Sequence, residues 1–114
     1  MGGDIGDGIY VSRIDTDEWT KDRDVGGSAH LLFEESDGST VGLWRADPDD
    51  APGPAPDVEI PLRETVLVLE GHVRVRVDDR PPLELTVGDF ASFPKGARIG
   101  WDPSHDCKVF WVYS

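Results

Sequence analysis

One carboxylate in this 114-residue chain stands in an otherwise apolar segment, and it is the side chain best placed to do chemistry. Glu64 opens a run in which Thr65 is followed by alternating valine and leucine up to Leu69. Because successive side chains of a β-strand point to opposite faces, an inward Glu64 shares its face with apolar residues. These are Val58, Ile60, Leu62, Val66 and Val68. Burial among them raises the pKa of a carboxyl group, which could then act as a general acid or base near neutral pH.

Glu64 also has a structural alternative, in which it accepts a backbone hydrogen bond or pairs with Arg98 or Arg45. A set of large side chains could surround a small organic ligand next to it. The candidates for this lining are Trp101, Trp44, Ile99, Ile60 and Phe110. Large aromatic residues also fill the interior of small barrels, so ordinary core packing stays open for each of them.

Other kinds of reactive site find little support in the sequence. His30, His72 and His105 are not spaced as the paired histidines of a metal site. No Gly-x-Ser-x-Gly, phosphate-binding loop or Cys-His signature is present. Cys107 is the only cysteine, cannot form an intrachain disulfide, and is expected to be an unreactive strand residue.

Short apolar or alternating runs, each closed by turn residues, make up the rest of the chain. Turns are predicted at Gly71 and at residues 78–79, 88–89 and 94–96. This pattern is typical of an all-β sandwich or barrel. Further strands are expected over 9–11, 28–34, 40–46 and 108–113, the second and third as a hairpin. Residues 47–56 hold four prolines and form either a plain connector or a rim of the site.

The spacing of these punctuating residues resembles the two sequence motifs of the cupins. Six residues separate Glu64 from Gly71, and five separate Gly88 from the Pro-x-Gly at 94–96. The phrase Val68-Leu-Glu-Gly71 and the following segment look most like the ureidoglycine aminohydrolase-like and ethanolamine-utilisation-type small cupins. The resemblance covers about residues 41–112 and implies a double-stranded β-helix (jelly-roll) barrel, in which Glu64 points inward. It divides the chain into an N-terminal segment, 1–27, and a single barrel domain, 28–114.

The departures from the motifs concern the metal ligands. The family's His-x-His positions fall on Val58 and Ile60, or on Asp57 and Glu59 with the longer spacing, and its second-motif histidine falls on Ile99. Of the four usual ligands only Glu64 is present, whereas a transition metal needs three or four converging ligands. The sequence therefore predicts no metal and no other cofactor.

Composition limits the partners and the setting. The chain carries 11 basic and 23 acidic residues, a net charge of −12, which disfavours binding to nucleic acid or to an anionic membrane surface. It has no apolar run long enough to span a bilayer, no visible signal peptide and one cysteine, so a cytoplasmic protein is expected. The apolar strand over 108–113 has one face for the barrel and one for a partner subunit, which predicts a homodimer.

Three functions remain open on the sequence. The first is a metal-free barrel that binds a small organic metabolite, with Glu64 as polar anchor and possible proton-transfer catalyst. The second is a metal-dependent cupin enzyme of the ureidoglycine-hydrolase kind with substituted ligands. The third is a non-catalytic accessory or regulatory dimer, which would have a barrel collapsed around its own side chains.

Overall fold

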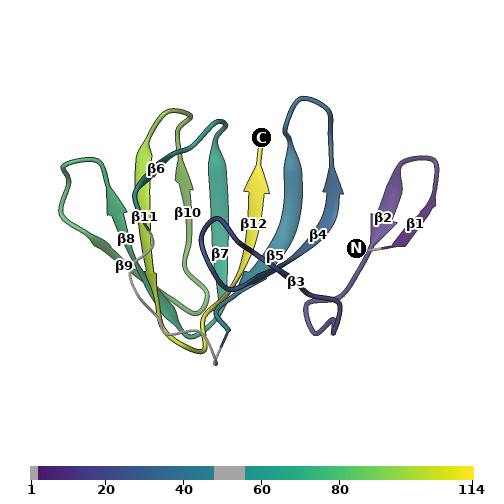
Figure 1. Cartoon of the computed structure of the whole chain (residues 1–114), viewed down its shortest axis with the longest axis horizontal. Coiled ribbons are helices and arrows are strands. Elements are labelled where there is room, and N and C mark those ends of the chain that lie inside the picture. Colours follow the sequence, from purple (N-terminus) through teal and green to yellow (C-terminus); the bar gives the residue numbers. More distant parts are fainter. Residues whose placement is uncertain (1–2, 48–55) are drawn as a thin grey trace.

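The computed structural model describes residues 3–47 and 56–114, and all their regular structure is β-strand. This part of the chain forms twelve strands, which are labelled in Figure 1. They are β1 (Gly3–Gly6), β2 (Ile9–Val11), β3 (Thr20–Lys21), β4 (Ser28–Glu34), β5 (Thr40–Arg45), β6 (Val58–Glu59), β7 (Glu64–Glu70), β8 (His72–Val77), β9 (Leu83–Thr86), β10 (Phe90–Phe93), β11 (Arg98–Pro103) and β12 (Lys108–Tyr113). Residues 3–47 and 56–114 contain no helix, and so none that is long and apolar enough to cross a membrane.

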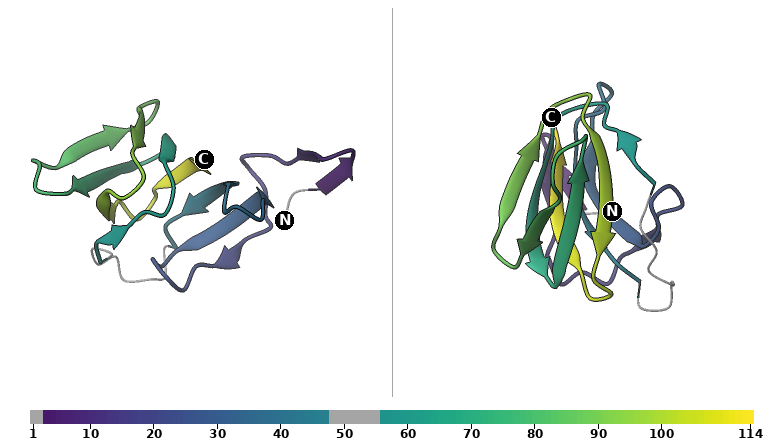
Figure 2. Two further views of the ribbon diagram at one scale, coloured as in Figure 1. Left: turned by 90° about the horizontal axis from the view of Figure 1, so that it is seen from above. Right: turned by 90° about the vertical axis from the view of Figure 1, so that its left-hand side faces the viewer.

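Two antiparallel sheets form the body of the molecule. The larger has six strands in the order β10-β7-β12-β5-β4-β3, and the smaller has four in the order β6-β11-β8-β9. In Figure 1 the four-stranded sheet lies to the left of β7, β12, β5 and β4. A third, two-stranded sheet, β1-β2, lies beyond β4 at the far end of the molecule in Figures 1 and 2.

Alternation along the strands sorts the side chains of both sheets into inner and outer sets. On β7, Val66 and Val68 are buried, and on β8 the whole valine row over 73–77 is buried. These residues join Ile99 and Phe93 in one apolar core between the sheets. The arginines of β8 point the other way: Arg74 pairs with Glu84 on β9, and Arg76 pairs with Asp102 on β11.

A single glycine connects β7 to β8. Gly71 has φ +68°, a left-handed conformation that glycine adopts without strain. A Cβ at this position would also fall within 2.6 Å of the Asp106 carboxylate, which packs against the turn with Ser104. The turn therefore requires glycine both for its conformation and for the close approach of the loop before β12.

The strands expected at 28–34, 40–46 and 108–113 are present, each within one residue of its predicted bounds. The predicted hairpin is formed by β4 and β5, which pair antiparallel. The segment over 9–11 is β2, and it pairs with β1. The strand β3, which adds an edge to the six-stranded sheet, was not predicted. Most of the proline-rich segment, residues 48–55, lies outside the described residues.

Candidate ligand-binding site

A cavity of about 340 Å³ lies between the two large sheets. The six-stranded sheet contributes side chains of β5, β7 and β12, and the four-stranded sheet contributes β6, β8 and β11. The loop before β4 closes part of its wall. The lining residues are Asp22, Asp24, Val25, Trp44, Val58, Glu59, Ile60, Pro61, Glu64, Val66, Val73, Trp101, Pro103, Cys107, Val109, Trp111 and Tyr113.

Glu64 supplies a buried carboxyl group to this cavity. Its side chain is 7% exposed, and its Oε1 atom has no hydrogen-bond partner in the described structure. In the ladder it stands between Phe93 of β10 and Tyr113 of β12. Burial raises the pKa of Glu64 to about 7, because the ionised form loses its hydration. Within the described residues, neither Arg45 nor Arg98 forms the ion pair that was the structural alternative.

The last strand provides two lining residues that the sequence analysis did not single out, Trp111 and Tyr113. They are separated by one residue, so they share the inner face of β12, and their rings lie 5.1 Å apart. Gly42 faces Trp111 across the ladder. The alternation of β12 could have revealed this pair, but only together with the register that fixes which face is inside.

Phe110 was the residue predicted from this strand, and the structure places it elsewhere. It pairs with Leu43 and Leu67 on the outer face of the six-stranded sheet, and it does not line the cavity. Adjacent residues of a strand point to opposite faces, so Phe110 and the lining residue Trp111 lie on different sides of the sheet. Ile99 is fully buried, but it packs in the core and not along the cavity wall.

The other predicted lining residues, Trp44, Trp101 and Ile60, all border the cavity. Trp101 is positioned by Phe93, whose ring meets it edge-to-face at 6.0 Å. Val58 and Ile60 occupy the two positions of the family's His-x-His motif. Val58 also lines the cavity, but it is 45% exposed because β6 is a two-residue edge strand.

Trp44 is fixed by the loop that closes the cavity. Its indole N–H donates a 2.8 Å hydrogen bond to the carbonyl of Gly26. Gly27 approaches so closely that a Cβ would fall 2.5 Å from the Trp44 ring. This contact sets the position of residues 22–25, which line the cavity.

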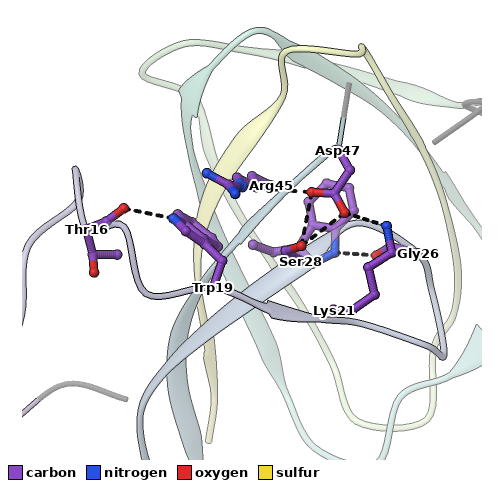
Figure 3. Close-up of polar contacts among 8 residues, drawn as sticks. Thr16, Trp19, Lys21, Gly26, Ser28, Arg45 and Asp47 are labelled. Atoms are coloured by element: carbon purple, nitrogen blue, oxygen red, sulfur yellow. Dashed lines mark hydrogen bonds and ion pairs between the residues drawn. The ribbon is translucent and has the colours of Figure 1, made fainter. Parts of the chain in front are cut away.

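Asp47 holds the same loop at its base. Its carboxylate accepts hydrogen bonds from Ser28 Oγ at 3.0 Å and from Lys21 Nζ at 2.7 Å (Figure 3). The hydrogen bond from Lys21 lowers the pKa of Asp47 below its usual value. Trp19, on the chain before this loop, packs over the guanidinium of Arg45 at 4.3 Å.

Cys107 and His30 take structural positions. Cys107 is 1% exposed in the turn before β12, and burial followed by the charge of Asp106 raises its pKa to about 12, so the thiol stays protonated. His30 is buried and bonds Ser12 Oγ and the Glu18 carbonyl through its two ring nitrogens.

The residues around Glu64 do not fit a transition metal. The motif positions that carry the other metal ligands in cupins are occupied here by Val58, Ile60 and Ile99, whose side chains have no donor atom. Among residues 3–47 and 56–114, no group of three or more His, Cys, Asp or Glu side chains is arranged to hold an ion. Glu64 is the one buried carboxyl group of the described lining, and fewer than the three or four side chains that a transition metal needs converge on it.

Two antiparallel sheets that enclose an inner site define a double-stranded β-helix barrel of the cupin class. The EutQ-like cupin domain family matches residues 33–108, which is more than half of the chain. The chain therefore belongs to the EutQ-like cupin domain family, in agreement with the fold and the broad family predicted from the sequence. No curated protein is significantly similar to the chain.

Solved structures support the same fold. A putative ethanolamine utilization protein Q from Salmonella typhimurium is 18% identical, with a TM-score of 0.64 over 83% of this chain and 76% of that one. A cupin-like protein from Thermotoga maritima is 15% identical, with a TM-score of 0.65 over 88% and 74%. A cupin-2 domain protein from Shewanella frigidimarina is 21% identical, with a TM-score of 0.60 over 75% and 78%. Identities this low show a shared fold and no shared activity.

Proposed function

We propose that this cupin binds a small organic molecule in the cavity between its sheets, without a transition metal, and that Glu64 is the polar group that anchors it. The observation that supports this is the unpartnered Oε1 atom of a buried carboxyl group on the wall of a 340 Å³ cavity. Buried polar atoms are nearly always hydrogen-bonded, so a ligand that bonds this oxygen would relieve its desolvation. An accessory domain with a collapsed barrel would offer no such space.

The same carboxyl group suits proton-transfer chemistry. With a pKa raised to about 7, Glu64 is present in both protonation states at neutral pH. It could take a proton from a bound molecule or give one to it, as isomerisation, elimination and hydrolysis require. Cys107 is excluded as a nucleophile by its raised pKa and burial.

Fragment binding with a matched pair of variants tests this proposal. Small alcohols, amides, amines and carboxylic acids are screened by ligand-observed NMR against the wild type, Glu64→Gln and Glu70→Gln. Glu70 lies on the same strand but is exposed and pairs with Lys108, so its variant removes the same charge outside the cavity. We expect Glu64→Gln alone to weaken the fragments that bind the wild type; equal binding by all three proteins would refute the role of Glu64.

Metal content separates the proposal from the metal-dependent alternative. The protein is purified without a tag or chelator and analysed by elemental mass spectrometry, before and after incubation with manganese, iron, nickel and zinc. The proposal predicts far less than one equivalent of any metal. A near-stoichiometric metal that is lost in Glu64→Gln would show a site with substituted ligands and would put the metal-dependent enzyme first.

A further inference from the structure

The charges around the cavity have one sign. Its described lining includes four acidic residues, and no Lys, Arg or His among the described residues borders it. The acidic residues are Asp22, Asp24, Glu59 and Glu64. Glu59 faces Arg98 across the ladder, away from its neighbour Val58, so its side chain contributes least to the interior. A carboxylate or phosphate ligand would therefore enter a site without a cation to pair with.

Two of these carboxyl groups converge on one tyrosine. Glu64 stands directly opposite Tyr113 on the neighbouring strand. The pKa of Tyr113 is raised to about 12 by burial and then by the charges of Glu64 and Asp22. The Asp22 Oδ1 atom accepts the backbone N–H groups of Asp24 and Val25 at 3.0 and 3.2 Å, which fixes its carboxylate beside the cavity. No salt bridge among the described residues neutralises Asp22 or Glu64.

Indole rings make up much of the remaining wall. Trp44, Trp101 and Trp111 all border the cavity. The N–H of Trp44 is already bonded to Gly26, so this ring offers only carbon atoms to a ligand. The face of an indole ring attracts cations, most strongly where water is excluded. A hydrated metal ion gains little from such walls, because it needs several oxygen ligands; an alkylammonium group gains from both the rings and the carboxylates.

From this arrangement we infer that the ligand of the cavity is a small organic cation, an amine or quaternary ammonium compound, held between the tryptophan rings and the carboxylates of Asp22 and Glu64. The inference rests on the proposed function and names its ligand class. It is argued from three observations together: the charges of one sign and the aromatic wall favour a positively charged occupant, and the unpartnered Glu64 oxygen supplies an acceptor for it.

Three probes of nearly the same shape and different charge test the inference by calorimetry at pH 8. They are choline, its neutral isostere 3,3-dimethylbutan-1-ol, and the anion 3,3-dimethylbutanoate. We expect choline to bind about tenfold more tightly than the alcohol, which is the size of one favourable cation–π contact in a dry site. The anion should bind more weakly than both.

Two aspartate variants test whether the positive charge of choline is recognised by the carboxylate of Asp22. Asp22→Asn should weaken choline about threefold, since its carboxylate is partly screened by solvent, and should leave the alcohol unchanged. Asp79→Asn removes an equal charge from the exposed turn between β8 and β9 and should change neither affinity. If Asp79→Asn weakened choline as much as Asp22→Asn, the effect would come from net charge and the inference would fail.

The affinity for choline should also rise with pH through about 7 and should lose this dependence in Glu64→Gln. Choline keeps its charge at every pH, so the change reports the ionisation of Glu64. The titratable groups that face Glu64 are Tyr113, whose pKa is raised to about 12, and Asp22 from the loop. Asp22→Asn repeats the pH series without the second carboxyl group, and the dependence on pH should persist in it.

The binding results distinguish failure of the cationic ligand class from failure of the proposed function, the metal-free binding of a small organic molecule. Binding of choline and the alcohol with equal affinity, or preferred binding of the anion, would refute the ligand class and would leave a metal-free binding barrel intact. Failure of all three probes to bind would count against both, because the cavity has room for each of them.

Discussion

Glu64 couples the site to the stability of the whole chain. The folded protein keeps a proton on Glu64 up to about pH 7, whereas the unfolded chain releases it near the ordinary value of 4.5. Between these values the folded state binds more protons, so the free energy of unfolding falls as the pH rises. Above about pH 7 both states are ionised and the loss levels off at about 3 kcal/mol. A carboxyl group kept at this cost in stability is consistent with a role in the cavity.

The variant Glu64→Gln should abolish this part of the pH dependence. Glutamine has nearly the same shape and no ionised form, so the variant should match the wild type near pH 4.5 and exceed its stability by up to about 3 kcal/mol above pH 7. Denaturant unfolding at intervals from pH 4.5 to 8.5 measures this difference. Glu70→Gln is the control, and parallel curves for the wild type and Glu64→Gln would show that Glu64 is not desolvated in the folded state.

The loop before β4 is the element that completes the cavity, and it depends on Asp47. Asp47→Ala removes the contacts from Ser28 and Lys21 and should lower the free energy of unfolding by about 1 kcal/mol. The loss is modest because Lys21 is half exposed, and water weakens its ion pair with Asp47. The amide of Gly26, which bonds the carbonyl of Asp22, should exchange with solvent faster.

Asp37→Ala is the matched control for this loop. Asp37 accepts the N–H of Ser39 at 2.9 Å in the turn between β4 and β5, away from the cavity. Its loss should also reduce stability, but hydrogen exchange measured by mass spectrometry should stay unchanged over residues 22–27. Equal exchange in the wild type and Asp47→Ala would show that Asp47 does not hold the loop.

Sequence patterns predicted the strands and turns that depend on local chemistry. The alternating valines of β8 and the glycine at 71 carry this information in their own residues. The inward position of Glu64 followed from the resemblance to a family whose motif glutamate faces inward. Strand register and loop packing depend on contacts between distant segments, which is why the sequence did not show on which face of β12 Phe110 lies and why Asp22 was not identified.

The outer face of the six-stranded sheet carries a row of large apolar side chains. Phe110, Leu67 and Phe90 lie in one row across β12, β7 and β10, and Phe90 is 77% exposed. Exposed aromatic residues at the end of an apolar row are typical of a subunit interface. The homodimer expected from the strand over 108–113 would bury this row.

The variant Phe90→Glu should therefore convert a dimer to a monomer without unfolding it. Light scattering after gel filtration should give twice the 12.5 kDa of one chain for the wild type and a single chain for the variant. Thr86→Glu adds the same charge to the outer face of the four-stranded sheet and should remain dimeric. A wild type that is monomeric at all protein concentrations would refute the expected homodimer.

The protonation of Glu64 in the unliganded protein is the property on which the account depends most. It can be measured directly by NMR, by following the side-chain carboxyl carbon of Glu64 through a titration from pH 4 to 9, with Glu64→Gln to assign the signal. We expect a midpoint near pH 7, because the group is buried and forms no ion pair with any residue that the structure describes. A midpoint near 4.5 would mean that the carboxylate is hydrated or paired, and the proposed anchor of the cavity would be lost.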